Sequence, residues 1–409
     1  MTSSIVIAGA GQAAVQLAGS LRQGGFDGAI TVVGDEPGLP YQRPPLSKEF
    51  MAGVTGTAAP LLRPESFYAA ERIALRGGQR VTAIDRAASR VTVSSGESLD
   101  YGHLVLATGA RNRPLMCEGV QLAGVHGLRT LADATVLRDH LGSARAVVVI
   151  GAGFIGLEFA AVAAARGLPV TVVELAPRCL ARAVSVPMAA HIADAHRGWN
   201  VRMCFETGVA RLFGADHVEA VETTSGERMP ADLVLVGIGV IPNVELAAEA
   251  GLLTSNGIVV NEHLLTSDPA ISAIGDCAIF PSPFAPAPVR LEAVQNAADQ
   301  ARAVASGLLG RPAAYAKVPW FWSDQGTLKL QIAGLSTGHD RCVLRGDPAQ
   351  GGFSVFCFQG ERLLAVESLN RPGDHMMARR MLSGRPVISD AQAGDVGFDL
   401  RTIGTAPNR

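Results

Sequence analysis

Residues 5–14 read IVIAGAGQAA, and this stretch decides the fold of the 409-residue chain. Its apolar start predicts a β-strand, which passes through the pattern GxGxxA into a helix that continues to Leu21. The same order returns at residues 147–156, VVVIGAGFIG, with a complete GxGxxG. A single motif of this kind also occurs in tight turns that bind no ligand. Two copies, each between a strand and a helix, predict two nucleotide-binding units.

Each small residue of the motif has its own physical purpose. The first glycine takes the tight turn, the second lets a diphosphate approach the backbone, and the third lets helix and strand pack closely. The helix N-terminus supplies oriented N–H donors and a partial positive charge. Ala14, in the third place of the first copy, is a tolerated variant. The residues predicted to contact the nucleotides are Gly9, Gly11, Ala13 and Ala14 in the first copy and Gly151, Gly153, Ile155 and Gly156 in the second.

A second strand, rich in β-branched residues, follows each motif and leads to an acidic residue. Residues 30–33 lead to Asp35, and residues 170–173 lead to Glu174. Each acid lies about 20 residues beyond the glycines, which is the spacing of the ribose-binding carboxylate in dinucleotide folds.

Two dinucleotide folds in one chain imply two dinucleotides, and a flavin with a nicotinamide is the economical pair. Such a chain would pass a hydride from one to the other. Glu174 would accept from the ribose 2′-hydroxyl and repel a 2′-phosphate, which favours NADH over NADPH. Arg182 and Arg178 lie near enough in sequence to contact the same ribose or diphosphate.

The two nucleotide-binding halves also end alike, at LVLATG (residues 104–109) and LVLVGIG (residues 233–239). Loop residues follow each strand, around Arg113 and around Pro242, and they predict chain crossings that insert the second unit into the first. After Pro319 the pattern changes, and residues 353–358 and 362–366 predict an antiparallel hairpin. Asp374 is expected to cap a helix that runs to about Leu382.

The expected fold class is α/β, with two Rossmann-like, glutathione-reductase-like dinucleotide domains and a C-terminal α+β domain. The predicted boundaries are 1–113 with 243–320 for the first nucleotide domain, 114–242 for the inserted one and 321–409 for the C-terminal one.

Composition excludes several classes of protein. With 48% hydrophobic and 18% charged residues the chain is globular, and its net charge of −2 creates no global attraction to nucleic acid or anionic membranes. No secretory leader precedes the first strand, so a cytoplasmic protein is expected. The six cysteines form no CxxC pair and lie far apart in sequence, which argues against a zinc ribbon and a dithiol redox motif. Structural disulfides are not expected either, because no secretory leader is seen and a chain of this length does not need them. The nine histidines show no metal-binding spacing, so no metal is expected.

The chain resembles the flavin-dependent ferredoxin reductases of bacterial oxygenase systems. The residues that carry the resemblance, besides the second glycine motif, are 40–48, 107–109, 128–130, 274–276, 290–294 and 319–325. The resemblance implies an enzyme that uses FAD and NADH and passes electrons singly to a [2Fe–2S] ferredoxin, which in turn feeds a haem monooxygenase or a Rieske-type dioxygenase.

The same resemblance implies that FAD lies on the first fold. Asp35 would bind the adenosine ribose, Val81 would meet the adenine through its backbone, and Asp276 would bind the ribityl chain near a helix that begins around residues 290–294. The diphosphate or the closing loop would be contacted by Thr108, Gly109 and Arg129. The full set assigned to FAD comprises the first glycine motif with Asp35, Arg43, Pro44, Lys48, Val81, Thr108, Gly109, Arg129, Asp276, Glu292, Val294 and Trp320.

The segment of residues 41–48 decides the subclass, because related flavoproteins that reduce disulfides or peroxides carry a reactive cysteine there and this chain has none. By resemblance, Pro44 would lie against the isoalloxazine and Lys48 beside its reactive nitrogen. Glu158 is expected in the first turn of the second motif's helix, where it would contact the nicotinamide carboxamide and pair with Lys48. The catalytic residues expected are therefore Lys48 and Glu158, and the NADH set is completed by Glu174, Arg182 and Gly239.

Two alternatives stay open at this point: an NADH oxidase or rubredoxin reductase on the same fold, and a redox-controlled interaction protein resembling apoptosis-inducing factor. Because ferredoxins are commonly acidic, the docking face is expected to be locally basic, with Arg311, Lys317 and Lys329 as candidates. Gly326 departs from the family, which commonly has an aromatic residue after Ser-Asp-Gln.

Overall fold

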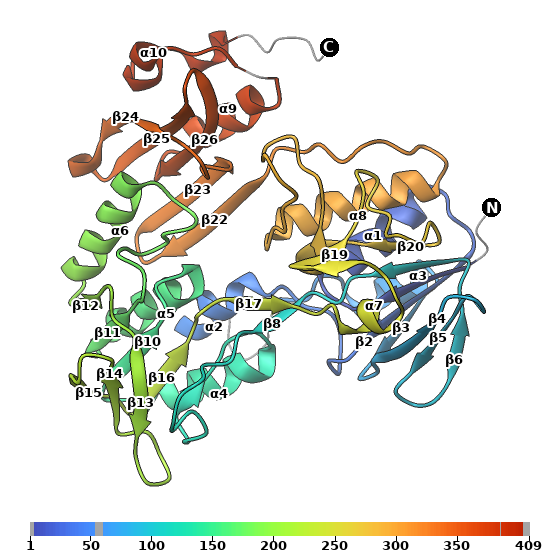
Figure 1. Cartoon of the computed structure of the whole chain (residues 1–409), viewed down its shortest axis with the longest axis horizontal. Helices are drawn as coiled ribbons and strands as arrows, with labels where there is room; N and C mark the ends of the chain where they lie inside the picture. Colours follow the sequence, from blue (N-terminus) through green and yellow to red (C-terminus); the bar gives the residue numbers. More distant parts are fainter. Residues whose placement is uncertain (1–3, 54–59, 385, 404–409) are drawn as a thin grey trace. The chain divides into compact units, whose positions relative to one another are not determined.

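The computed structural model describes residues 4–53, 60–384 and 386–403 (Figure 1). The chain divides into two compact units. The first comprises Met1–Gln42, Pro60–Arg111 and Ile241–Pro319, and the second comprises Arg43–Ala59, Asn112–Val240 and Trp320–Arg409. The chain passes between the units in strands β8 (Ala110–Asn112) and β17 (Val240–Pro242), close to both predicted crossings. The three domains predicted from the sequence stay a prediction, and the units differ from them by grouping residues 43–59 and the C-terminal part with the inserted segment.

The first unit is built on a five-stranded parallel sheet in the order β20-β7-β1-β2-β3. Its strands are β1 (Ser4–Ala8), β2 (Ala29–Gly34), β3 (Ile73–Gly77), β7 (His103–Leu106) and β20 (Ile271–Ala273). Helix α1 (Gln12–Gln23) packs against α8 (Val294–Leu308), and both share one apolar core with the sheet. The smaller elements are α3 (Glu65–Ala70), α7 (Glu245–Glu249), the 3-10 turn η2 (Gly275–Cys277), β4 (Val81–Asp85), β5 (Arg90–Val93), β6 (Ser98–Asp100), β18 (Thr254–Ser255), β19 (Gly257–Val259) and β21 (Ala278–Ile279).

The second unit repeats this plan with a parallel sheet in the order β12-β11-β10-β16-β9. Its strands are β9 (Val125–His126), β10 (Val147–Ile150), β11 (Val170–Val173), β12 (Val201–Cys204) and β16 (Leu233–Val236). Its helices are α4 (Leu131–Leu141), α5 (Phe154–Ala165) and α6 (Val186–Gly198). An antiparallel sheet of β13 (Val209–Phe213), β14 (Ala220–Thr223) and β15 (Arg228–Pro230) follows, and the segment after Gln42 adds η1 (Pro44–Ser47) and α2 (Glu49–Ala52).

The C-terminal part of the second unit is an antiparallel sheet in the order β22-β23-β26-β25-β24. Its strands are β22 (Trp320–Gln325), β23 (Leu328–Gly334), β24 (Arg341–Asp347), β25 (Gly352–Gln359) and β26 (Arg362–Leu369), and it is accompanied by α9 (Pro372–Leu382), α10 (Asp390–Gly394), η3 (Pro348–Gln350) and η4 (Leu400–Thr402). The predicted hairpin is β25 with β26. The fold class, α/β with an α+β C-terminal part, is confirmed.

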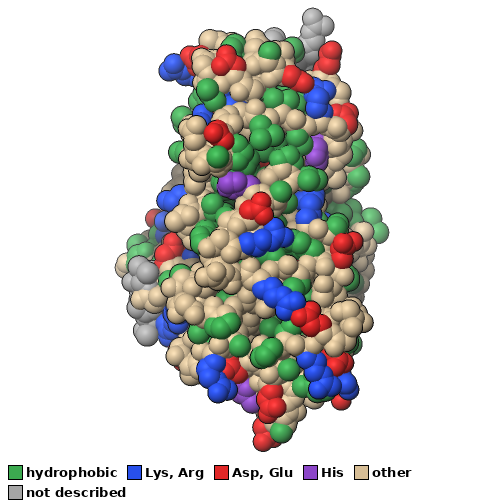
Figure 2. Space-filling model, turned by 90° about the vertical axis from the view of Figure 1, so that its left-hand side faces the viewer, with side chains coloured by type: hydrophobic (Ala, Val, Ile, Leu, Met, Phe, Trp, Pro, Cys, Tyr) green, Lys and Arg blue, Asp and Glu red, His purple; other side chains and the backbone are tan. Residues whose placement is uncertain are grey.

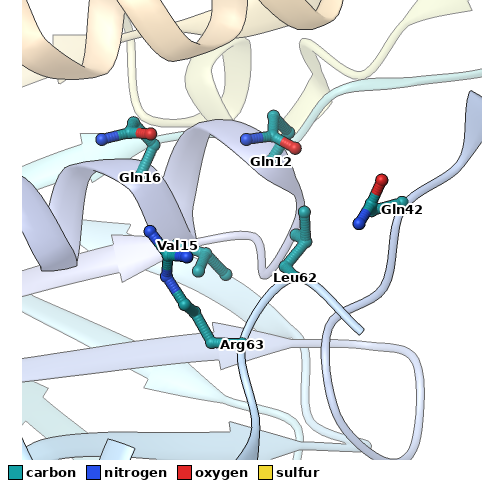
Figure 3. Close-up of a pocket in the computed structure, with 6 residues that line it drawn as sticks. All are labelled: Gln12, Val15, Gln16, Gln42, Leu62 and Arg63. Atoms are coloured by element: carbon teal, nitrogen blue, oxygen red, sulfur yellow. The ribbon is translucent and has the colours of Figure 1, made fainter. Parts of the chain in front are cut away.

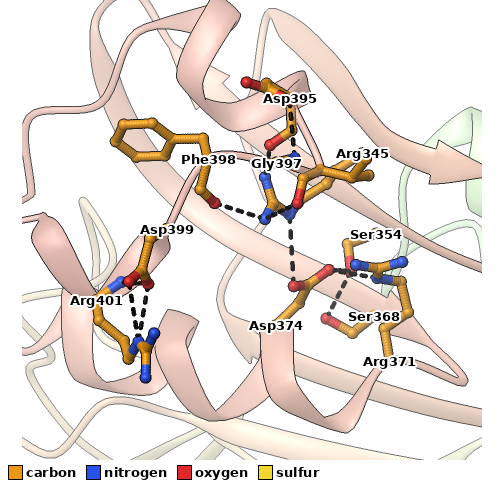
Figure 4. A network of polar contacts seen from close by, with 11 residues as sticks. Arg345, Ser354, Ser368, Arg371, Asp374, Asp395, Gly397, Phe398, Asp399 and Arg401 are labelled. Carbon is orange, nitrogen blue, oxygen red and sulfur yellow. Dashed lines mark hydrogen bonds and ion pairs between the residues drawn. The ribbon is translucent and has the colours of Figure 1, made fainter.

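Two local expectations are wrong. Asp374 does not cap α9, which begins at Pro372. Its carboxylate instead accepts from Ser354 (2.9 Å) and Arg371 (2.7 Å) in the network of Figure 4. Glu158 is not in the first turn of α5, because that helix begins at Phe154, before the third glycine. The register of β24 with β25 places Cys342 directly opposite Cys357, although the two cysteines are separated in sequence.

Across the described ranges, every helix is too short or too polar to traverse a lipid bilayer.

Candidate functional site

The glycine loop of the first unit joins β1 to α1 and contains two different kinds of glycine. Gly9 has a φ of +118°, and a Cβ at this position would lie 2.1 Å from the Ala107 carbonyl oxygen, so only glycine fits. Gly11 has an ordinary φ of −84°, and a Cβ there would meet nothing within 4 Å. The fold therefore requires Gly9, whereas Gly11 leaves open space before the N-terminus of α1, which has no side-chain cap. This space suits a diphosphate.

A pocket of about 240 Å³ opens beside the first turns of α1 (Figure 3). Its walls combine amide side chains with a guanidinium and two aliphatic groups: Gln12, Val15, Gln16, Gln42, Leu62 and Arg63. Ala13 and Ala14 are buried on the other side of the helix start, where Ala13 lies against Gly275. The sequence did not single out the pocket residues, because they come from three separate segments.

Asp35 follows β2, as the motif predicts, and forms an ion pair with Arg80 at 3.0 Å. Both side chains are more than half exposed, so the pair contributes little to stability and can rearrange around a ligand. Val81, which follows Arg80, is buried at the start of β4. Arg80 is thus a candidate binding residue that sequence reasoning missed, although its position beside Val81 was a signal.

Asp276 lies in η2, just after β20, and hydrogen bonds hold this turn to α8 and to the segment before it. The Gly275 N–H donates to Gln300 Oε1 (2.7 Å). Arg290 donates to the Asp276 carbonyl oxygen (3.1 Å) and pairs with Glu292 (2.7 Å). Helix α8 then begins at Val294 without a side-chain cap. The predicted residues Asp276, Glu292 and Val294 therefore gather at one helix N-terminus, where a partial positive charge favours anions.

Thr108 and Gly109, which follow β7, are held by Asn243 through three hydrogen bonds. Thr108 Oγ1 donates to the Asn243 carbonyl oxygen (2.7 Å), and Asn243 Nδ2 donates to that of Thr108 (2.8 Å). The Asn243 N–H also donates to the Gly109 carbonyl oxygen (2.9 Å). Asn243 is a positioning residue that the sequence indicated only as part of a loop.

The glycine loop of the second unit repeats the geometry of the first. A Cβ on Gly151 would lie 2.5 Å from the Gly237 carbonyl oxygen, and one on Gly156 would lie 2.2 Å from that of Gly151. Gly153 again has open space, with its nearest neighbour at 3.9 Å, and α5 has no side-chain cap. Ile155, on the first turn of α5, is 41% exposed. Both loops therefore fit a dinucleotide at their second glycine.

Glu174 is anchored at the end of β11 by two backbone donors. The Ala152 N–H donates to its Oε2 (2.7 Å), and the Ala176 N–H donates to its Oε1 (2.8 Å). The carboxylate thus joins the glycine loop to the turn after β11. Arg182 is exposed, with Nη2 3.7 Å from a Cβ built on Gly239, whereas Arg178 donates to the carbonyl oxygens of Ala181 and Val184. Arg178 therefore supports its own loop, and Arg182 is the better ligand candidate.

Lys48 and Glu158 form a buried ion pair within the second unit. Lys48 Nζ lies 2.9 Å from Glu158 Oε2, and the side chains are 11% and 2% exposed. Lys48 also donates to the Pro44 carbonyl oxygen (3.1 Å). The hydroxyls of Ser47 (2.5 Å) and Ser323 (2.7 Å) donate to the two oxygens of Glu158. Removing one charge would leave the other buried, so the pair depends on both partners.

The hydrogen bonds continue from Glu158 into the helix α6. Gln325 Nε2 donates to Ser323 Oγ (3.1 Å), and Gln325 Oε1 lies 3.0 Å from His196 Nε2. Ser323, Gln325 and His196 are fully buried, and burial lowers the pKa of His196, which favours its neutral imidazole. The sequence placed Ser47, Ser323 and Gln325 in signature segments without indicating their role, and it did not identify His196.

The other predicted residues of the second unit lie near these elements. Arg43 donates to the Arg129 carbonyl oxygen (2.6 Å), which ties the start of η1 to the segment before α4. Trp320 lies at the start of β22 and contacts two residues of α9: His375, with ring centroids 5.7 Å apart, and Arg379, whose Cζ is 4.5 Å from the Trp320 ring centroid.

Gly326 lies in the turn between β22 and β23 with a φ of +56°. A Cβ there would lie 2.9 Å from the ring of Trp199, which follows α6. The space beside this turn is therefore filled by an aromatic side chain from elsewhere in the same unit.

The candidate docking cations Arg311, Lys317 and Lys329 are all exposed. Lys329 is paired across β22 and β23 with Asp324, so an opposite charge lies on the same face of the sheet. On the face shown in Figure 2, basic and acidic side chains are interspersed. Of the three cations, Lys329 is thus the one with an acidic cross-strand neighbour.

Comparison with protein families finds two matches. Residues 3–301 match the family described as pyridine nucleotide-disulphide oxidoreductase, and residues 320–404 match the family described as reductase C-terminal.

Comparison with individual proteins finds relatives of nearly equal length. The chain is 51% identical to rhodocoxin reductase from Rhodococcus erythropolis over 399 residues, which are 97% of this chain and 93% of the relative. The crystal structure of a ferredoxin reductase from Rhodopseudomonas palustris is 48% identical, with a TM-score of 0.95 over 98% of this chain and 99% of that one. The reductase in a covalent putidaredoxin reductase–putidaredoxin complex is 43% identical, with a TM-score of 0.93 over 98% and 97%.

Proposed function

The chain belongs to the pyridine nucleotide-disulphide oxidoreductase family, and we propose that it is an FAD-dependent ferredoxin–NAD⁺ reductase of an oxygenase system. It takes a hydride from NADH and passes electrons singly to a [2Fe–2S] ferredoxin. The ferredoxin feeds a haem monooxygenase or a Rieske-type dioxygenase. The observation that carries this proposal is one open glycine loop in each unit, in a chain that is similar over nearly its whole length to a ferredoxin reductase. Bound FAD supplies the conversion of a two-electron hydride into single-electron steps.

We assign FAD to the loop at Gly11 and NADH to the loop at Gly153. The open space at both glycines and the uncapped helices behind them support this assignment. The domains 1–113 with 243–320, 114–242 and 321–409 would then be the FAD, NADH and C-terminal domains. A cytoplasmic location belongs to the same proposal, because all six cysteines are free thiols and a reducing compartment keeps them so.

Lys48 is the proposed cation of the reaction. An ammonium group has three donors, and within the described residues two of them go to Glu158 and to the Pro44 carbonyl oxygen. One donor is thus left for the flavin. Glu158 holds this ammonium in place, because the hydroxyls of Ser47 and Ser323 fix both of its carboxylate oxygens. In this arrangement Glu158 positions Lys48, and the contact of Glu158 with the carboxamide of NADH belongs to the same proposal.

The test is turnover of the purified holoprotein with NADH and a panel of acceptors. Ferredoxin should be reduced much faster than rubredoxin or oxygen. Equal or faster turnover with oxygen would indicate an NADH oxidase instead, and equal or faster turnover with rubredoxin would indicate a rubredoxin reductase. Slow turnover with every acceptor, together with a persistent complex after NADH addition, would favour a redox-controlled interaction protein.

A further inference from the structure

Two cysteines that are 15 residues apart in sequence stand side by side in the C-terminal sheet. Cys342 of β24 is the direct cross-strand partner of Cys357 of β25, and both are thiols. Directly opposed residues of an antiparallel pair have Cα atoms about 4.5 or 5.5 Å apart, depending on the pair type. Both values fall within the range of about 4.4–6.8 Å that disulfides span. The register therefore places the two side chains opposite each other on one face of the sheet, with a Cα separation that a disulfide can span.

The two thiols differ in a way that suits a stepwise oxidation. Cys342 is partly exposed, whereas Cys357 is fully buried. The hydrogen bond from Cys357 lowers the pKa of Cys342, and the same bond together with burial raises that of Cys357. The accessible sulfur is thus the one that ionises first, and thiolates are the nucleophiles in thiol chemistry.

A buried carboxylate lies next to the inner thiol. Cys357 Sγ is 3.6 Å from Glu367 Oε1, and Glu367 is fully buried on β26. Its two oxygens accept from the backbone N–H (2.8 Å) and the hydroxyl (2.6 Å) of Ser185. Burial raises the pKa of Glu367. The Glu367 carboxylate is therefore placed to accept the proton that the Cys357 thiol loses when its sulfur forms a disulfide bond.

We propose that Cys342 and Cys357 form a reversible disulfide when the protein meets a peroxide. In the first step the Cys342 thiolate attacks one oxygen of hydrogen peroxide. An S–O bond forms, the O–O bond breaks, hydroxide leaves and Cys342 becomes a sulfenic acid. In the second step the Cys357 sulfur attacks Cys342. The S–S bond forms, the S–O bond breaks, and the hydroxyl group leaves as water with the proton from Cys357, relayed by Glu367. The sum is two thiols and one peroxide giving one disulfide and two waters.

The bond should be easily reduced. Cross-strand Cβ atoms are about 4.5–5.5 Å apart, whereas a relaxed disulfide holds them at about 3.5–4.5 Å. The strands must therefore approach each other for the bond to close, and strained disulfides are the labile ones.

Peptide mapping of the peroxide-treated holoprotein tests the proposal directly. Trypsin cuts after Arg341, Arg345 and Arg362, so the disulfide would join the peptides of residues 342–345 and 346–362. The expected result is this linked pair, with loss of two of the six thiols and full recovery in dithiothreitol. Oxidation of the other cysteines with these two peptides unlinked, or progress of Cys342 to a sulfinic acid, would overturn it.

Variants separate the two steps. Cys357→Ser should leave a sulfenic acid on Cys342 that dimedone traps, whereas Cys342→Ser should give neither product. Glu367→Gln should lengthen the life of the sulfenic acid without slowing its formation. Cys117→Ser, at another partly exposed cysteine, is the matched control and should form the linked peptides as the wild type does. Dimedone labelling of Cys342 that is equal in wild type and in Cys357→Ser would contradict the second step.

Discussion

Glu158 on α5 forms an ion pair with Lys48 and accepts hydrogen bonds from Ser47 and Ser323. Residues from three separate segments therefore meet at one buried carboxylate. The distance from Lys48 Nζ to Glu158 Oε2 is 2.9 Å. Because both charged groups are nearly excluded from solvent, the charge of each partner offsets the cost of burying the other.

Lys48→Met should therefore destabilise the protein as well as slow hydride transfer. Leaving a buried charge without its partner costs about 3–5 kcal/mol in the free energy of unfolding. The double variant with Glu158→Gln should recover part of this loss, because it removes both charges. Urea unfolding measures the stability effect, and anaerobic stopped-flow reduction by NADH measures the kinetic one. Purely additive effects in the double-mutant cycle would contradict the pairing.

The two kinds of glycine in the first loop should respond differently to alanine. Gly9→Ala forces a Cβ to within 2.1 Å of a carbonyl oxygen at a positive φ, so it should lower the melting temperature strongly or abolish folding. Gly11→Ala meets no protein atom within 4 Å, so the fold should persist while FAD affinity falls. Circular dichroism and FAD titration of the apoprotein separate the outcomes. Unchanged FAD affinity in a folded Gly11→Ala protein would show that the FAD diphosphate does not bind at this loop.

Glu174 should set the preference for NADH. Its carboxylate is held by the Ala152 and Ala176 N–H groups, where it would repel a 2′-phosphate. Glu174→Gln keeps the shape and removes the charge, so the ratio of kcat/KM for NADH over NADPH should fall by about tenfold or more, the equivalent of about 1.4 kcal/mol. Arg178→Lys is a control, because Arg178 supports its own loop. A wild-type enzyme that prefers NADPH would refute the assignment.

Charge reversal on the proposed docking face should affect ferredoxin alone. Arg311→Glu should raise the KM for ferredoxin and flatten its dependence on salt, while NADH-driven ferricyanide reduction stays unchanged. Lys329→Glu should have a smaller effect, because Asp324 already lies opposite Lys329. If ferredoxin turnover responds neither to ionic strength nor to these reversals, docking depends on apolar contacts instead.

Acid should destabilise the first unit through His103. Burial lowers the pKa of His103 from 6.5 to about 4, and its Nε2 lies 2.9 Å from Ser272 Oγ. Since the unfolded chain binds this proton more readily, the neutral imidazole stabilises the fold above pH 6.5, and that contribution is lost as the pH falls from 6.5 toward 4. The slope is at most about 1.4 kcal/mol per pH unit for one proton. His103→Gln should reduce the slope in unfolding experiments over this pH range, and an unchanged slope would exclude His103 as its source.

The features that the sequence determined by itself are local ones. A strand, a glycine turn, a helix and an acid at a set distance follow one another along the chain, so both nucleotide loops, Asp35 and Glu174 could be predicted from consecutive residues. Two apolar runs joined by the short segment of residues 359–361 likewise indicated the hairpin of β25 with β26.

Tertiary structure alone decided which distant segments meet. Ser323, Gln325 and His196 extend the hydrogen bonds of Glu158 only because β22 packs beside α5 and its Gln325 lies next to His196 of α6. Cys342 faces Cys357 only because of strand register, in which a shift by one residue would turn one of the two side chains to the other face of the sheet. Short-range patterns encode local conformation, whereas packing and register arise from the combined burial of many residues, and no spacing within one segment reports them.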